Sequence, residues 1–148
     1  MSEKPKKHSK HYSRCCVVQA LYQWHHTQDN PAEIIEQFTA EQHLQKADRK
    51  YFKKLLLGVI AEQSALDALI TPHLDREFSA LTPVELAILR LAAYELVHCP
   101  EVPYKVVINE ALEIAKDYGA DQSYKYVNAI LDAIAAQNRT VEVKPPQL

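Results

Sequence analysis

The stretch VELAILRLAAYEL, residues 84 to 96, decides the fold of this chain. Its apolar residues fall on nearly every side of a helix, so we expect this helix at the centre of the molecule with other helices around it. Arg90 and Glu95 interrupt the apolar run and require partners, because an unpaired buried charge is costly. We expect those partners in the following helix, at Lys105 or Glu110, and interpret the charges as structural.

Two further apolar runs follow the first at helical spacing: VVINEALEIAK at residues 106 to 116 and YVNAIL at 126 to 131. The chain contains only two glycines, and its long segments are rich in Ala, Leu, Glu, Lys and Gln. These side chains lose little conformational freedom in a helix. The sequence therefore predicts an all-α protein.

Helix starts are marked by NPAE at residues 30 to 33 and TPVE at 82 to 85. Each has a capping side chain, proline at the first helical position and Glu three residues after the cap. Gly119 is expected to end one helix and Asp121 to cap the last. We predict six helices, at about residues 10–27, 31–42, 48–71, 83–98, 104–118 and 122–137. A short extra turn near 73–80 would be a seventh.

The prolines predict how these helices are grouped. Pro72 on one side of the central helix and Pro100 with Pro103 on the other divide a single helical domain, residues 10–137, into halves of about 10–71 and 73–137. Residues 1–9 are expected to form a flexible basic arm. Residues 138–148, which include two adjacent prolines, are expected to form a loose tail.

Bulk properties exclude several classes of protein. The three cysteines have no C-x-x-C spacing and follow no apolar signal stretch, which favours a reducing cytoplasm. No apolar run reaches the ~18 to 20 residues needed to cross a bilayer. The sequence also lacks a Gly-rich phosphate loop, a G-x-S-x-G turn and an H-E-x-x-H motif. We therefore expect neither an enzyme nor a cofactor.

A metal site is also not expected, although His8, His11, Cys15 and Cys16 lie close together in the sequence. A helix brings His11 and Cys15 onto one face. These ligands lie at a chain terminus without a paired motif, which argues against zinc.

The charge is distributed unevenly. Residues 1 to 14 carry five cations against Glu3, a net charge of +4, while the whole chain has −2, so the remainder carries −6. Such a basic segment attracts polyanions locally. Cations beside Tyr12 suit a single-stranded nucleic acid, since ammonium groups pair with phosphates and a ring stacks on an unpaired base. A solvated tail without any partner is the competing interpretation.

Four motifs resemble the NusB family of bacterial transcription antitermination factors. They are ALYQW at 20 to 24, ILRLAAYEL at 88 to 96, PYKVVINEALEIAK at 103 to 116 and SYKYVNAILD at 123 to 132. They occur in the family's order, and the resemblance covers roughly residues 10 to 136. It implies a NusB-like helical bundle in two parts.

The resemblance also implies a site for boxA-type RNA. In the family the basic N-terminal end of the first helix contributes to RNA binding. This chain has lysine and histidine where the family is commonly arginine-rich, so fewer multidentate guanidinium contacts are available. Tyr126 replaces the family's usual phenylalanine on the RNA-facing surface; its alternative role is packing between helices. The RNA-binding residues expected on this basis are Lys6, Lys7, Lys10, His11, Arg14, Lys125 and Tyr126.

The partner implied by the family is NusE, a ribosomal protein of the small subunit. The resemblance places the docking surface on the first helix and the beginning of the central helix, at Tyr22 and Glu85. An acidic Glu85 suits a basic ribosomal protein. It also occupies the third position of a capping box, and the two roles are compatible. Tyr22 has core packing as its alternative.

These implications define the expected function. The chain would be an RNA-binding adaptor that pairs with NusE on boxA-type RNA in nascent ribosomal RNA and joins the RNA polymerase antitermination complex. A protein adaptor without RNA binding is one alternative. A NusB-like module related to RNA cytosine methyltransferases is another.

Overall fold

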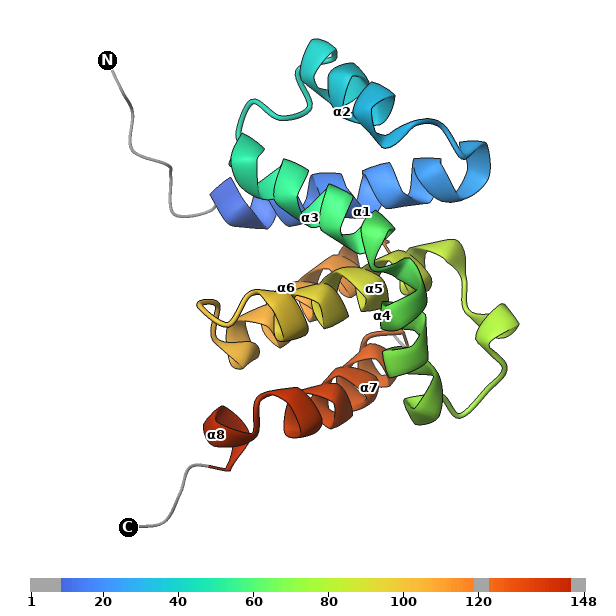
Figure 1. Cartoon of the computed structure of the whole chain (residues 1–148), viewed down its shortest axis with the longest axis vertical. Coiled ribbons are helices and arrows are strands. Elements are labelled where there is room, and N and C mark those ends of the chain that lie inside the picture. Colours follow the sequence, from blue (N-terminus) through green and yellow to red (C-terminus); the bar gives the residue numbers. More distant parts are fainter. Residues whose placement is uncertain (1–8, 119–122, 145–148) are drawn as a thin grey trace. The chain divides into compact units, whose positions relative to one another are not determined.

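The computed structural model describes residues 9–118 and 123–144. Within these ranges every regular element is a helix, which confirms the all-α prediction (Figure 1). The elements in chain order are α1 (Ser9–Thr27), α2 (Pro31–Ala40), α3 (Arg49–Ala61), α4 (Gln63–Ile70), η1 (Thr71–His73), η2 (Phe78–Ala80), α5 (Pro83–His98), α6 (Tyr104–Tyr118), α7 (Ser123–Asn138) and α8 (Thr140–Val143).

The expected bounds of α5 and α6 are confirmed, but the single helix predicted over residues 48–71 is wrong. It is broken at Glu62, whose φ of −101° and ψ of 15° are not helical, and α4 begins after it. Neither proline nor glycine marks this break in the sequence, and the apolar spacing continues through it. The predicted cap positions Gly119 and Asp121 lie outside the described residues.

The chain divides into two compact units, the first ending at Ala61 and the second beginning at Glu62. The division therefore falls ten residues before Pro72, where the sequence placed it. In the first unit α1 packs along α3, and α2 lies against both (Figure 1). Phe38 of α2 and Phe52 of α3 stack with ring centroids 5.7 Å apart, and both are buried.

Hydrogen bonds fasten the start of α1 to the start of α3. The Ser13 hydroxyl donates to the Asp48 carbonyl oxygen at 2.7 Å, and the Asp48 N–H donates to the Ser9 carbonyl oxygen at 3.2 Å. The Asp48 carboxylate accepts from the Tyr51 N–H at 3.0 Å, which caps α3. The first turn of α1 is therefore fixed within its unit.

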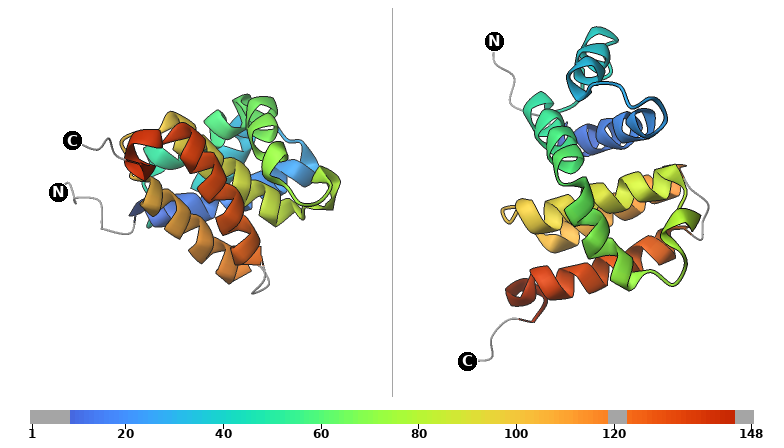
Figure 2. Two further views of the ribbon diagram at one scale, coloured as in Figure 1. Left: turned by 90° about the horizontal axis from the view of Figure 1, so that it is seen from below. Right: turned by 45° about the vertical axis from the view of Figure 1, so that its right-hand side comes forward.

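The second unit is built around α5. All residues of this helix from Leu86 to Leu96 are buried, as its apolar pattern predicts. Helices α4, α6 and α7 each pack against it, and α6 also packs along α7. Helix α4 runs across α5 and α7, which can be followed in Figure 1 and in the right-hand view of Figure 2.

Arg90, in the middle of α5, is paired with Asp67 of α4 and not with a residue of α6 as we expected. Its Nε and Nη2 donate to the two carboxylate oxygens, each at 2.7 Å. The side chains are 9% and 25% exposed. A bidentate pair of this kind is strong and directional, so it fixes α4 against α5. The expectation of Glu110 or Lys105 followed chain order, whereas the acid comes from the preceding helix.

Arg139, which the sequence placed in a loose tail, closes the C-terminal end of α5. Its guanidinium donates to the carbonyl oxygens of Leu96 at 2.8 Å, Cys99 at 2.8 Å, Val102 at 2.9 Å and Glu95 at 3.2 Å, and to the Glu142 carboxylate. All five N–H donors are thereby used. The last carbonyl oxygens of a helix have no hydrogen-bond donors within the helix, and here one buried arginine donates to them.

The single turn of α8 positions Glu142 between Arg139 and the start of α6. One carboxylate oxygen accepts from the Tyr104 N–H at 3.0 Å. This backbone hydrogen bond, and then the Arg139 contact, hold the pKa of Glu142 below its ordinary value. The stabilisation is therefore complete above the ordinary carboxyl pKa and is lost as the pH falls through the lowered value. The expected loose tail from residue 138 is thus wrong for residues 138–143.

Among the described residues, no single helix is long and apolar enough to cross a membrane. The two segments Arg49–Ala61 and Gln63–His73, which are separated by a break, pass this test only when taken together, on length and composition alone.

We predict that Asp67→Ala lowers the free energy of unfolding by roughly 2 to 3 kcal/mol, because it leaves Arg90 buried without its acid. This is below the ~3 to 5 kcal/mol of a fully buried pair because Asp67 is partly exposed. Asp67→Leu combined with Arg90→Met should recover most of the loss, since two apolar side chains need no partner. Urea denaturation followed by circular dichroism measures both.

Asp75→Ala is the matched control for Asp67→Ala. Asp75 also pairs with an arginine, Arg76, but its side chain is 74% exposed, so its removal should change stability by less than about 0.5 kcal/mol. A double variant no more stable than Asp67→Ala alone would contradict the assignment of Arg90 as a charge that only Asp67 compensates.

Candidate nucleic-acid interface

The basic residues at the start of α1 differ in their exposure. Lys10 is exposed and His11 is half-buried, but Arg14 is only 3% exposed. The Lys10 Nζ lies 4.9 Å and the Arg14 Cζ 5.4 Å from the ring centroid of Tyr51 on α3. The buried Arg14 therefore packs on Tyr51, and Lys10 is the cation that this end of α1 presents to solvent.

Tyr12 supplies an exposed ring on the same turn of α1. It is 41% exposed, and the Lys46 Nζ lies 5.8 Å from its ring centroid. This pairs a cation with an aromatic surface that an unpaired base can reach. Tyr12 was expected from the sequence, whereas Lys46, which lies in the connection between α2 and α3, was not. Lys6 and Lys7, expected to contact RNA, lie outside the described residues.

Tyr126, on the first turns of α7, is half-buried, and its ring has a cation against it. The Arg76 Cζ lies 3.9 Å from the ring centroid. The Tyr126 hydroxyl is buried and has no hydrogen-bond partner among the described residues. The ring therefore packs in the second unit, as the alternative role expects, and also lies against a partly exposed guanidinium.

The surroundings of Tyr126 shift the pKa of its hydroxyl upward. Burial disfavours the phenolate and is the largest cause, the Arg76 charge opposes it, and the carboxylates of Asp75 and Glu85 add to it. The pKa of Arg76 is also raised, first by its hydrogen bond with Asp75. Tyr126 therefore stays neutral and Arg76 stays charged at physiological pH.

Two further groups surround the start of α7. Lys125 is exposed beside Tyr126, as a phosphate contact requires. On α6, the Lys116 Nζ lies 4.8 Å from the ring centroid of Tyr124. The first turns of α7 therefore carry two tyrosines, each with a cation over its ring, and an exposed lysine between them in sequence. This combination of positive charge and aromatic rings is typical of surfaces that bind single-stranded nucleic acid.

Glu85 joins the start of α5 to the start of α7. One carboxylate oxygen accepts from the Thr82 N–H at 2.9 Å, while the Thr82 hydroxyl accepts from the Glu85 N–H at 3.1 Å. This confirms the capping box that TPVE predicted. The other oxygen accepts from the Ser123 hydroxyl at 3.0 Å. The structure thus brings Glu85 close to Tyr126, although sequence analysis assigned them to different partners.

A cleft of about 320 Å³ opens beside Glu85, between α5, the end of α6 and the start of α7. Its walls are mostly apolar and include Val84, Ile88 and Tyr118. Tyr118 is 43% exposed and stands at its edge. A mostly apolar cleft with a carboxylate in its wall suits a protein partner that offers an apolar side chain next to a cation.

Tyr22, the other residue expected to contact a protein partner, is exposed on α1. Its side chain is 44% exposed, and its ring packs edge-on against His26 with centroids 4.5 Å apart. The alternative that Tyr22 is a core residue is therefore wrong. Tyr22 and Glu85 belong to different units.

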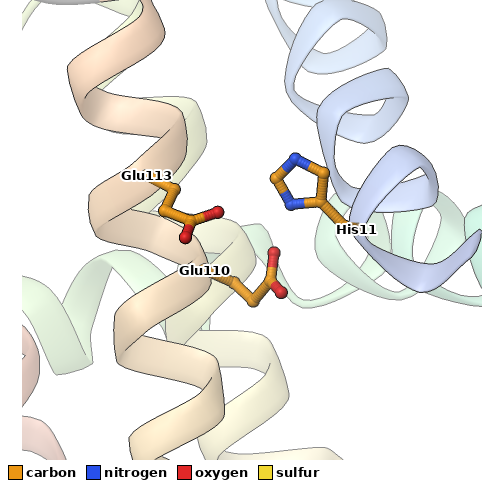
Figure 3. Close-up of side chains that lie close together, drawn as sticks. All are labelled: His11, Glu110 and Glu113. Carbon is orange, nitrogen blue, oxygen red and sulfur yellow. The ribbon is translucent and has the colours of Figure 1, made fainter. Parts of the chain in front are cut away.

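Glu110 and Glu113 project from the same side of α6, one helical turn apart (Figure 3). Sequence analysis interpreted Glu110 as a structural polar residue. The His11 Nε2 lies 3.6 Å from the Cys15 Sγ one turn along α1, which confirms that the two share a face. Two carboxylates on one turn are common on a polar helix face and do not by themselves define a metal site.

Arg76 is the residue of this region that sequence analysis missed. It lies between η1 and η2, in the segment expected to form only a short extra turn. The adjacent Asp75 cancels its charge, so the sequence shows no local excess of positive charge there. No sequence pattern connects Arg76 with Tyr126, 50 residues further on. Contact between η1 and α7 brings the two segments together.

The fold and these surfaces describe an all-helical binding protein, and comparison with known proteins agrees. The NusB family model matches residues 11–136. The transcription antitermination protein NusB of Coxiella burnetii is 50% identical over 131 residues, which cover 88% of this chain and 95% of that protein.

Solved structures show the same similarity. NusB from T. maritima has a TM-score of 0.76 at 31% identity, covering 93% of this chain and 94% of that one. A crystal structure of the antitermination factors NusB and NusE in complex with double-stranded RNA has a TM-score of 0.78 at 26% identity, covering 86% and 96%. The chain belongs to the NusB family.

Tyr126→Phe should stabilise the protein by about 1 to 3 kcal/mol, because it removes a buried hydroxyl for which the described residues offer no partner. The expected result is a higher urea midpoint with an unchanged denaturant slope. Tyr22→Phe is the control, because the exposed Tyr22 should show a change near zero. Destabilisation by Tyr126→Phe would mean that the hydroxyl does have a partner in solution.

Proposed function

We propose that this chain is a transcription antitermination factor of the NusB type. It acts as an adaptor without catalytic activity, which binds a NusE-type ribosomal protein and boxA-type RNA in nascent ribosomal RNA and joins the RNA polymerase antitermination complex. The observation that carries the proposal is the match over 95% of the length of a relative named for antitermination, together with the likeness to a NusB that is bound to NusE and RNA. The place of action would be the cytoplasm, where the three cysteines stay reduced.

RNA contacts are assigned in each unit separately, to the cations and rings described above. Lys10 and His11 contribute from α1, and Lys125 and Tyr126 from α7, with Lys6 and Lys7 preceding α1. Arg14 supports this surface by fixing Tyr51 beneath Lys10, since its guanidinium is buried. Unpaired bases stack on flat side chains, so a surface of this composition favours a single strand over a duplex.

Contacts with the protein partner are assigned to one residue in each unit, Tyr22 on α1 and Glu85 beside the cleft. The oxygens of Glu85 accept from Thr82 and Ser123, and the same carboxylate can attract a basic protein without giving up its role as a cap. Joining two charged surfaces in one complex raises the affinity for RNA, because the second contact becomes intramolecular.

The two alternatives make different demands. A protein adaptor without RNA binding would leave the exposed Lys10 and Lys125 without a role. A module related to RNA cytosine methyltransferases is disfavoured because the matched relative is covered almost completely by this chain and is named as an antitermination protein. We therefore expect no methyl transfer by the purified protein.

The first test is fluorescence anisotropy of a labelled boxA-type RNA, titrated with the chain alone and with an equimolar NusE-type partner at two salt concentrations. The mixture should bind more tightly than either component, and added salt should weaken binding, because phosphate contacts release counterions. A scrambled RNA of equal length is the control. Partner binding without any gain in RNA affinity would leave the protein-only adaptor.

Single charge removals test the assigned RNA residues in the same mixture. Lys10→Gln and Lys125→Gln should each reduce the slope of log affinity against log salt by about 0.7, the value for one phosphate contact on a single strand. Lys53→Gln, an exposed lysine on α3 outside the proposed surface, should leave the slope unchanged. Equal effects of all three variants would show that only the overall charge matters and would contradict the site.

A further inference from the structure

Two contacts hold the guanidinium of Arg76 in place: one with the Tyr126 ring and one with the Asp75 carboxylate. Its Cζ is 3.9 Å from the ring centroid, within the ~3.5 to 4.0 Å at which carbon atoms make optimal contact. Its Nε is hydrogen-bonded to the Asp75 carboxylate at 3.2 Å. These two contacts restrict the orientation of the guanidinium, although the side chain is 43% exposed.

Stability alone gives little reason for this arrangement. An exposed pair such as Asp75 with Arg76 contributes about 0 to 1 kcal/mol, and an exposed cation over a ring about 0.5 to 1 kcal/mol. The Tyr126 ring beneath is itself positioned at the cost of a buried hydroxyl that has no partner in the part of the chain that the structure describes. The Arg76 guanidinium lies against the supporting ring and its side chain is 43% exposed, so part of the group is open to solvent. RNA-binding proteins stack bases on arginine planes as well as on aromatic rings.

The local charges decide which part of a nucleotide Arg76 would take. Asp75 already pairs with the guanidinium, and Glu85 lies near enough to act on it, so these carboxylates oppose a phosphate there. Lys125, exposed next to Tyr126 on α7, has no acid partner among the described residues to compete with a phosphate. The base therefore belongs on Arg76 and the phosphate on Lys125.

We propose that Arg76, supported by the Tyr126 ring, is a nucleotide-binding residue on which one unpaired RNA base stacks. This inference rests on the proposed function and adds to it a residue outside α7 and outside the basic arm. Tyr126 then acts as the support beneath the guanidinium, so the RNA contact is made by a two-layer stack and not by the tyrosine ring directly.

The test replaces the plane but keeps the charge. In the mixture with the NusE-type partner, Arg76→Lys should weaken binding of boxA-type RNA about 5-fold to 100-fold, the range expected for loss of one stacked base. The salt slope should not change, because the number of cations is the same. Arg49→Lys is the matched control, since Arg49 is an exposed arginine on α3, and its affinity should equal that of the unaltered protein.

A second measurement reports on stacking directly. A set of boxA-type RNAs would carry 2-aminopurine at successive positions, one position in each RNA. The unaltered complex should quench the fluorescence of one of them, and the complex with Arg76→Lys should restore it. Circular dichroism should show the same urea midpoint for both proteins, because Arg76 is exposed, which separates lost stacking from lost folding.

Each other outcome overturns the inference in a recognisable way. If the unaltered complex shows no salt-sensitive RNA binding, the proposed function fails and the inference fails with it. If RNA binds but Arg76→Lys keeps full affinity while Arg76→Ala lowers the salt slope, Arg76 contacts a phosphate and the stacking proposal is wrong. If either variant binds RNA more tightly, Arg76 covers Tyr126 and competes with the base.

Discussion

The burial of α5 is the constraint on which the rest of the second unit depends. A helix buried continuously from Leu86 to Leu96 has no water for its charged side chains or for the carbonyls of its last turn, so these groups need partners from other parts of the chain. Asp67 of α4 pairs with Arg90 in the middle of α5, and Arg139 donates hydrogen bonds to the carbonyl oxygens at its C-terminal end. The positions of α4 and of the chain after α7 follow from these requirements.

The N-terminal end of α5 meets the same requirement in a way that also shapes the proposed interface. Its capping box uses one oxygen of Glu85, and the other accepts from Ser123 at the beginning of α7. That hydrogen bond fixes the turns that carry Lys125 and Tyr126. Stability and binding are therefore combined in one carboxylate, so substitutions of Glu85 have to be interpreted with both effects in mind.

The helices that local chemistry defines were predictable, and those defined by packing were not. Proline after a capping residue located the starts of α2 and α5, and a capping box was confirmed at Thr82. The break at Glu62 has no local signal, because the apolar spacing continues across it although α3 and α4 belong to different units. Likewise, residues 138–143 lack an apolar pattern, and hydrogen bonds of Arg139 and Glu142 order them.

The sequence by itself determined the all-α class, the central place of α5, the family and the cationic and aromatic character of the proposed RNA surface, since these depend on residue types and their spacing. Only the tertiary structure decided that Arg14 is buried on Tyr51, that Asp67 pairs with Arg90, and that Arg76 lies on Tyr126. The physical reason is that a charge finds its partner by proximity in space, and residues distant in sequence become neighbours only when the helices pack.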